Sequence, residues 1–204
     1  GDWPTGEVNL IFRWGCTNST GRSGAKFLNK VPSIEWCCDK KQARLNMQLA
    51  GISVPPTWSV PDFLEEYANC TGEFVLRRAT HTQGKELWKG SIADTLAAII
   101  RHNVQDGYVS SYINKVAEYR VMIVSNRVVW VNKTTEGRDD TSIAWNYGNG
   151  ENVYWSEWPL EVVKQALAAA KLSNTDFCAV DVMEDANGKA YVSEVDTAPA
   201  QEGT

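Results

Sequence analysis

Three acidic residues near the end of the chain are spaced so that their side chains could share one metal ion. Asp181 lies in an apolar run, and Glu194 and Asp196 end a second β-rich run that follows the turn sequence Asn187-Gly188. Alternate side chains of a strand share a face, so Glu194 and Asp196 point the same way. If the two runs pair as a hairpin, Asp181 lies opposite or near them. Carboxylates gathered in this way favour a hard divalent cation such as Mg²⁺; the alternative is an acidic surface hairpin without a ligand.

The composition is that of an ordinary globular protein and excludes several other classes. The 204 residues are 43% hydrophobic and 22% charged, enough for one sizeable core or two small lobes. The net charge is −5 and no long basic run occurs, so we expect no duplex nucleic acid as a partner. No stretch approaches the roughly 18 apolar residues of a membrane helix, and no secretory leader opens the sequence. The five cysteines form no Cys-x-x-Cys pair, which favours a reducing, cytoplasmic setting.

The elements that must position the carboxylates are short strands and helices in an α+β order. In the last expected helix, Leu160, Val163, Leu167 and Ala170 are spaced to face the core. The first forty residues are expected to be largely irregular, and the polar, Gly- and Asn-rich segment 134–155 is expected to be a loop. This order predicts largely antiparallel sheets. Strands are expected at 8–12, 74–79, 108–113, 119–124 and 127–133 and in the hairpin 178–200, and helices at 40–50 with Asp39 as N-cap, 61–67, 92–102 and 159–171.

Several motifs occur in an order that is typical of one superfamily. The closing run is Asp181-Val-Met and then, after the turn, Ser193-Glu-Val-Asp-Thr-Ala-Pro-Ala200. Earlier in the chain, Asp39-Lys40 precedes a helix and the stretch Gly51-Ile-Ser-Val-Pro-Pro56. Together these segments resemble the ATP-grasp superfamily, and especially its carboxylate–amine ligases, which include ribosomal-protein glutamate ligases and glutathione-synthetase-like enzymes. The resemblance runs from about residue 39 to residue 200. It implies the ATP-grasp fold, in which two lobes with largely antiparallel sheets clasp ATP between them.

The resemblance implies roles for residues along the whole chain. Asp181, Glu194 and Asp196 would hold Mg²⁺, although Asp196 stands where the family mostly has Asn. Arg77, where the family usually has Lys, and Arg120 would be the catalytic cations that neutralise charge on the phosphoryl group; the alternative for Arg120 is a cross-strand ion pair. The implied nucleotide-binding residues are Lys40, Arg77, His81, Gln83, Gly84, Ser111, Tyr112, Ile113, Glu118, Lys133 and Asn146.

Particular contacts are expected within this set. The Gly-containing loop 80–86 resembles the family's lid over the triphosphate, because backbone N–H groups approach phosphate oxygens closely at a glycine. The backbone of Ser111, Tyr112 and Ile113 would bind the adenine edge. Glu118 would accept from the ribose hydroxyls, and Lys133 would lie at the phosphate or acceptor site. We expect His81 to be a loop residue rather than a catalyst.

The implied function is that of a ligase that depends on ATP and Mg²⁺ and joins a carboxylate to an amine through an acylphosphate. Two alternatives remain open: a small-molecule kinase on the same fold, and a non-catalytic nucleotide-binding or interaction module. We expect an N-terminal segment at 1–38, an N-lobe at 39–110 and a C-lobe at 111–204. Since only about 38 residues precede the match, either the chain is a compact, phage-like form, or a partner chain such as a second copy supplies substrate recognition.

Overall fold

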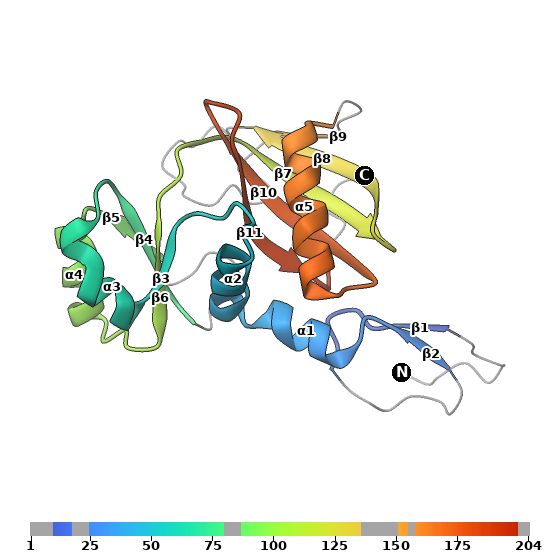
Figure 1. Cartoon of the computed structure of the whole chain (residues 1–204), viewed down its shortest axis with the longest axis horizontal. Coiled ribbons are helices and arrows are strands. Elements are labelled where there is room, and N and C mark those ends of the chain that lie inside the picture. Colours follow the sequence, from blue (N-terminus) through green and yellow to red (C-terminus); the bar gives the residue numbers. More distant parts are fainter. Residues whose placement is uncertain (1–9, 18–24, 80–86, 136–150, 155–157, 200–204) are drawn as a thin grey trace.

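The computed structural model describes residues 10–17, 25–79, 87–135, 151–154 and 158–199, which form two main sheets with helices against them (Figure 1). In chain order the elements are β1 (Leu10–Phe12), β2 (Lys26–Leu28), α1 (Val31–Cys38), α2 (Lys40–Leu49), β3 (Thr57–Ser59), α3 (Val60–Glu66), the 3-10 turn η1 (Tyr67–Asn69), β4 (Phe74–Arg78), β5 (Leu87–Gly90), α4 (Ile92–Arg101), β6 (Gly107–Ser111), β7 (Lys115–Val124), β8 (Arg127–Thr135), β9 (Glu151–Tyr154), α5 (Leu160–Ser173), β10 (Phe177–Asp185) and β11 (Ala190–Asp196).

The smaller sheet has the strand order β3-β6-β4-β5, and each neighbouring pair is antiparallel. Its core lies under α3 and α4, where Phe63 and Phe74 are fully buried. Trp58 meets both rings edge-on, with centroids 6.0 Å from Phe63 and 6.2 Å from Phe74. Such aromatic packing buries large apolar areas. It fixes β4 and β6, the strands that carry Arg77 and Tyr108.

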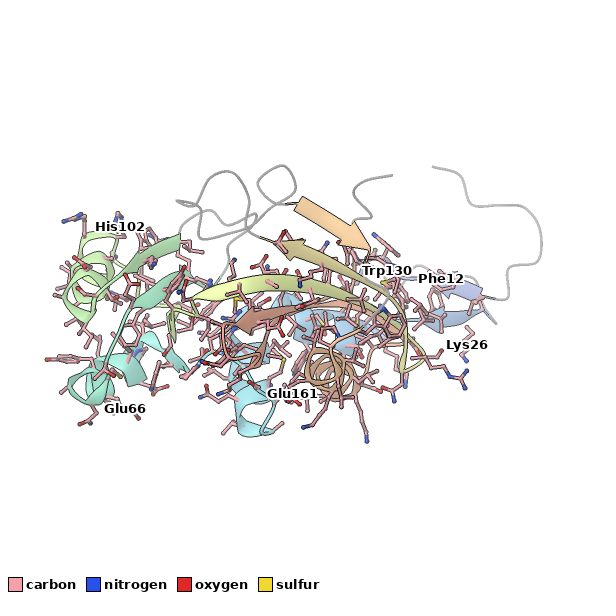
Figure 2. All side chains as sticks on the ribbon, turned by 90° about the horizontal axis from the view of Figure 1, so that it is seen from above. Phe12, Lys26, Glu66, His102, Trp130 and Glu161 are labelled. Carbon is pink, nitrogen blue, oxygen red and sulfur yellow. The ribbon has the colours of Figure 1, made fainter. Side chains whose placement is uncertain are left out.

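The larger sheet has the strand order β11-β10-β7-β8-β9, and all its pairs are antiparallel. Helix α5 covers one face of this sheet, as Figure 2 shows around the labelled Glu161. The core between them contains Val121, Val180 and, from α5, Ala166, all fully buried. Met47 of α2 joins the same core, so α2 is fixed against the larger sheet. The division of the chain at residues 38/39 and 110/111 stays a prediction.

The expected α+β class with largely antiparallel sheets is confirmed. The β7–β8 and β10–β11 hairpins form where the sequence predicts them, as do α2, α3, α4 and α5. Asp39 caps α2 as expected, since its Oδ1 accepts from the backbone N–H of Gln42 at 3.0 Å. The parallel pairing of β1 with β2 is the exception among the described strands.

Three parts of the chain differ from the expectation. The first forty residues contain α1, started by Pro32 in its first turn, and the short strand β2. Strand β9 forms inside the segment 134–155, where pairing with β8 satisfies a polar backbone. The buried side of α5 carries Val162 and Ala166, whereas Leu160 is 82% exposed. Alanines let the helix approach the sheet closely, and that contact, rather than the larger leucine, sets the buried face.

Candidate functional site

Four polar side chains form a row across the larger sheet. Glu194 of β11 lies opposite Asp181 of β10, Asp181 lies opposite Arg120 of β7, and Arg120 lies opposite Asn132 of β8. Residues directly opposite on neighbouring strands share a face. We call these four residues the polar row; they lie on the face away from α5. The expected approach of Asp181 to Glu194 is therefore confirmed.

A β-bulge at Ser193 turns Glu194 onto this face. The register shifts between Asp181, opposite Glu194, and Val182, opposite Val192, so Ser193 is an extra residue in β11. In a regular strand Val192 and Glu194 would share a face, but here Val192 is fully buried in the core under α5 while Glu194 joins the polar row. The Ser193 hydroxyl donates to the Asp181 carbonyl at 3.1 Å, and its own carbonyl accepts from Nη2 of Arg44.

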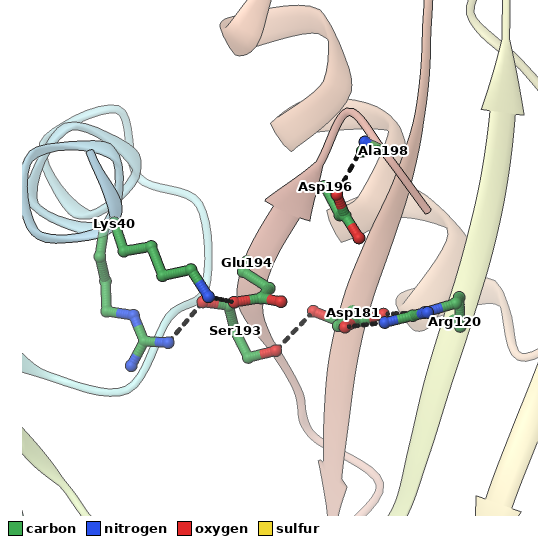
Figure 3. Close-up of polar contacts among 8 residues, drawn as sticks. Lys40, Arg120, Asp181, Ser193, Glu194, Asp196 and Ala198 are labelled. Carbon is green, nitrogen blue, oxygen red and sulfur yellow. Dashed lines mark hydrogen bonds and ion pairs between the residues drawn. The ribbon is translucent and has the colours of Figure 1, made fainter. Parts of the chain in front are cut away.

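The carboxylates are engaged by cations and by backbone. Arg120 donates to Asp181 through both Nε and Nη2, at 2.8 and 2.9 Å, in a bidentate ion pair. Lys40 Nζ lies 2.6 Å from Oε2 of Glu194. Figure 3 shows Lys40 and Arg120 reaching the β10–β11 hairpin from opposite sides. The third carboxylate, Asp196, accepts from the backbone N–H of Ala198 at 2.8 Å.

These contacts set the protonation of the carboxylates. Burial raises the pKa of Asp181 and outweighs the opposing effect of Arg120, and the charges of Glu194 and Asp196 raise it further. Burial would also raise the pKa of Glu194, but Lys40 and the neighbouring guanidinium groups lower it below its ordinary value. The ion pair with Asp181 raises the pKa of Arg120. The three carboxylates and Arg120 therefore act on one another as a single electrostatic group.

A second group of cations lies beside this one. Arg77 of β4 donates from Nη1 to Oγ of Ser110 at 2.8 Å. The guanidinium carbons of Arg44 and Arg77 lie 5.7 and 5.8 Å from the ring centroid of buried Tyr108. Burial, and then repulsion by Arg44, lower the pKa of Arg77 to about 10. Arg44 is 5% exposed, and its Nε and Nη1 are buried with no hydrogen-bond partner among the described residues. Together with Lys40, these side chains give a concentration of positive charge that suits an anion.

The structure places Lys133 on the other face from the polar row, whereas Glu118 lies two residues before Arg120 on β7 and so shares its face. Lys133 lies opposite Tyr119, with its ammonium 5.5 Å from that ring centroid, and alternation therefore places it on the α5 face rather than beside Arg120. Glu118 is paired with Lys115 at 2.5 Å, and burial raises its pKa. Its expected contact with a ribose would have to compete with this lysine.

The expected adenine-binding segment lies at the end of β6. The backbone N–H of Ser111 donates to Pro56 at 2.9 Å, and that of Tyr112 donates to Glu73 at 2.8 Å. These two donors are already used within the protein. Ile113 follows the strand, and its carbonyl accepts from the N–H of Lys115 at 2.9 Å.

Other expected features lie outside the described residues or stay predictions. His81, Gln83, Gly84 and Asn146 fall outside the described ranges. Within those ranges, no group of three or more His, Cys, Asp or Glu side chains is arranged to hold a metal ion. The magnesium assignment therefore stays a prediction. None of the helices described is long and apolar enough to cross a membrane.

Two members of the site were missed from the sequence. Arg44 is four residues after Lys40 in a helix that the sequence did predict, and this spacing places both side chains on one face. That signal was present and could have found it. Asn132 is opposite Arg120 only because the β7–β8 register shifts between Met122 and Ile123. Counting back from the hairpin turn without that shift would have placed Val131 there.

Comparison with known proteins identifies the fold. No family model and no curated protein matches the sequence. The solved structure of the ATP-grasp ligase PsnB, complexed with a phosphomimetic variant of minimal precursor, Mg and ADP, matches with a TM-score of 0.68 at 17% identity, over 89% of this chain and 57% of that chain. D-Alanine–D-alanine ligase from Bacillus anthracis matches with a TM-score of 0.68 at 18% identity, over 86% of this chain and 62% of that chain. The macrocyclase MdnC from Microcystis aeruginosa, bound with precursor peptide MdnA, gives 0.63 at 15% identity, over 86% and 57%.

The chain spans less than two thirds of the length of these three structures. Most of its own length is matched in each case. The arrangement of the two antiparallel sheets is thus matched in proteins of very different sequence. The chain therefore has the ATP-grasp fold.

Proposed function

We propose that the chain is the ATP-grasp part of a ligase that depends on ATP and Mg²⁺ and joins a carboxylate to an amine. The observation that carries this proposal is the meeting of Asp181, Glu194 and Arg120 on one face of the larger sheet, with Lys40 reaching the same place from α2. A row that combines paired carboxylates with strong cations suits the transfer of a phosphoryl group.

The donor chemistry of the site fits Mg²⁺. Carboxylate oxygens are the hard ligands that this ion prefers, and Asp181, Glu194 and Asp196 would supply them. An ion held there would neutralise part of the charge of the phosphates. Asp196 adds a third carboxylate to this donor set. In the structure Lys40 pairs with Glu194, Arg120 pairs with Asp181, and Asp196 accepts from the backbone N–H of Ala198.

The chain's own cations have the task of orienting the phosphates. Lys40 of α2 and Arg77 of β4 would supply positive charge to the phosphate oxygens. Arg120 would neutralise charge that develops as the phosphoryl group moves to the substrate carboxylate. The amine would then attack the acylphosphate carbon and release phosphate. Ile113 is our candidate for the adenine contact, because the N–H groups of Ser111 and Tyr112 are already used.

Two measurements test the proposal. We expect ATP with Mg²⁺ at about 100 times its Kd to stabilise the chain by about 2.7 kcal/mol, which is a rise in Tm of roughly 5–10 °C for a chain of this size. Asp181→Asn and Glu194→Gln should abolish the part of this rise that depends on Mg²⁺. If the wild-type chain shows no rise, the proposed nucleotide site is wrong.

Hydroxylamine distinguishes the ligase from its rivals. It replaces the natural amine and traps an acylphosphate as a hydroxamate, whereas the phosphoester made by a kinase does not react. We propose peptides and amino acids as the first carboxylates to test, since matched structures of PsnB and MdnC contain precursor peptides. Hydroxamate formation with release of ADP supports a ligase; a stable phosphorylated product without hydroxamate would instead indicate a kinase.

A further inference from the structure

The two best candidates for metal ligands are each held by a cation of the chain itself. Asp181 uses both of its oxygens in the ion pair with Arg120, and Glu194 uses one oxygen in the ion pair with Lys40. Neither pair is on the open surface, since the four side chains are 25–33% exposed. They are also not sealed in the core, so Lys40 and Arg120 have room to change partners.

The same two cations are the ones that the proposed function assigns to phosphate. A phosphate group can compete with a carboxylate for Lys40 and Arg120, because both anions offer oxygen atoms that accept charge-assisted hydrogen bonds. The guanidinium of Arg44, by contrast, is buried and donates to the Ser193 carbonyl. It stays beside Glu194 whichever partner Lys40 takes. Among the described residues, Asp196, Asn132, Arg77 and Glu118, which is paired with Lys115, also lie around these groups.

We propose that Lys40 and Arg120 are exchangeable counter-ions that couple the binding of metal and nucleotide at this site, a role that rests on the proposed function and deepens it. In the ion pairs that the structure shows, they neutralise Glu194 and Asp181. When a nucleotide and a divalent cation bind together, Lys40 and Arg120 would leave the carboxylates, which would hold the metal, and would pair with the phosphates. The carboxylates and the two cations then each face opposite charge both before and after the ligands bind.

Either ligand alone leaves this exchange incomplete. A metal ion without nucleotide must displace Lys40 and Arg120 from the carboxylates. The two cations then have no anion to pair with, and they repel the metal ion. A nucleotide without metal draws the two cations away and leaves Asp181, Glu194 and Asp196 to repel one another. An opposite charge within about 4–6 Å lowers the proton affinity of a carboxylate by roughly 10- to 1,000-fold. A divalent cation binds the same oxygens, so a nearby lysine or arginine should weaken its binding as well.

The test measures binding of Mn²⁺ to the whole chain by electron paramagnetic resonance, without and with a non-hydrolysable ATP analogue. Lys40→Met removes one counter-ion, and we expect it to tighten binding of Mn²⁺ alone by about tenfold while it weakens binding of the analogue. Lys40→Arg keeps the charge and should leave the affinity for Mn²⁺ alone near that of wild type. Lys41→Met is the matched control. Lys41 pairs with Asp106, which is not one of the proposed metal ligands, so the affinities for Mn²⁺ and for the analogue should not change.

The outcomes separate this inference from the proposed function. If wild type binds neither Mn²⁺ nor the analogue when both are present, the proposed function itself fails. If wild type binds both together but Lys40→Met binds Mn²⁺ alone no more tightly than wild type, the site stands and the counter-ion role of Lys40 is wrong. Far-ultraviolet circular dichroism of each variant confirms that the chain is folded. A variant that loses its fold is replaced by Lys40→Gln, to which the same criterion applies.

Discussion

Replacing Arg120 by Met leaves a partly buried carboxylate without its cation, and this should cost the chain a measurable part of its stability. The two hydrogen bonds of the Arg120–Asp181 pair, at 2.8 and 2.9 Å, disappear. Asp181 then lies beside Glu194 and Asp196, whose charges already raise its pKa. Met keeps most of the apolar contact of the arginine stem, so the change is mainly electrostatic.

The exposure of the pair sets the magnitude. Removing one partner of a fully buried ion pair costs about 3–5 kcal/mol, and an exposed pair contributes about 0.2–1 kcal/mol. The side chains here are 32% and 25% exposed, so solvent screens part of the interaction. We therefore expect a loss of about 2 kcal/mol. For a chain of this length that lowers Tm by about 4–8 °C.

The pH dependence of this loss gives a second check. Burial raises the folded-state pKa of Asp181 and Arg120 opposes it, so the substitution raises that pKa further. A raised folded-state pKa means that folding favours the protonated carboxyl. The stability that this group contributes is then present at low pH and is lost as pH rises through the folded-state pKa. The difference between variant and wild type should accordingly be smaller at about pH 4.5 than at about pH 7.5.

Thermal and urea unfolding of the chain without ligands measure both effects. Lys164→Met is the matched control, because its pair with Glu161 on α5 is a solvated surface pair at 3.4 Å and should leave Tm unchanged. The double variant Arg120→Met/Asp181→Asn removes the unpaired charge and should recover most of the loss. If the double variant is as unstable as Arg120→Met alone, the unpaired carboxylate is not the cause and the reasoning fails.

Three further predictions concern other parts of the chain. Arg77→Lys should keep nucleotide binding, measured by calorimetry, because it keeps the charge beside Ser110; complete loss would mean that the bidentate guanidinium is essential. Asn132→Ala should lower Mg²⁺-dependent ATP turnover several-fold while Lys133→Met leaves it near wild type, since alternation places only Asn132 beside Arg120; the reverse order would contradict the register. Burial raises the pKa of Cys37 to about 12 and that of Cys178 to about 11, so iodoacetamide at about pH 8 should label the two exposed cysteines and spare these, as mass spectrometry of the folded chain would report.

The sequence predicted most elements because their signals are local. Asp39 as the cap of α2 depends on only a few neighbouring residues, as does the hairpin turn before Arg127. The buried face of α5 depends instead on what the helix packs against, so Leu160 was placed wrongly. Lys133 is expected at the phosphate or acceptor site from the resemblance alone, and this role stays a prediction; the face on which it lies is decided by a register that the turn alone does not give.

Both flanks of the polar row depend on bulges, and these follow from where the core needs its apolar residues. In β11 the core takes Val192 and Val195, three residues apart, and a regular strand cannot turn both inward. The extra residue between them therefore rotates Glu194 away from the core, where an unpaired carboxylate would be strongly disfavoured.

Strand β8 repeats this arrangement. Val128 and Val131 both contact the core under α5, again three residues apart, and Val129 is the extra residue, 50% exposed. If β8 paired with β7 without this register shift, Val131 would lie opposite Arg120, and Asn132 would point into the apolar layer under α5. An apolar interval of three inside an otherwise alternating run was thus a signal for both bulges. It indicates that burial of valines, rather than attraction between charges, brings Glu194 and Asn132 into line with Asp181 and Arg120.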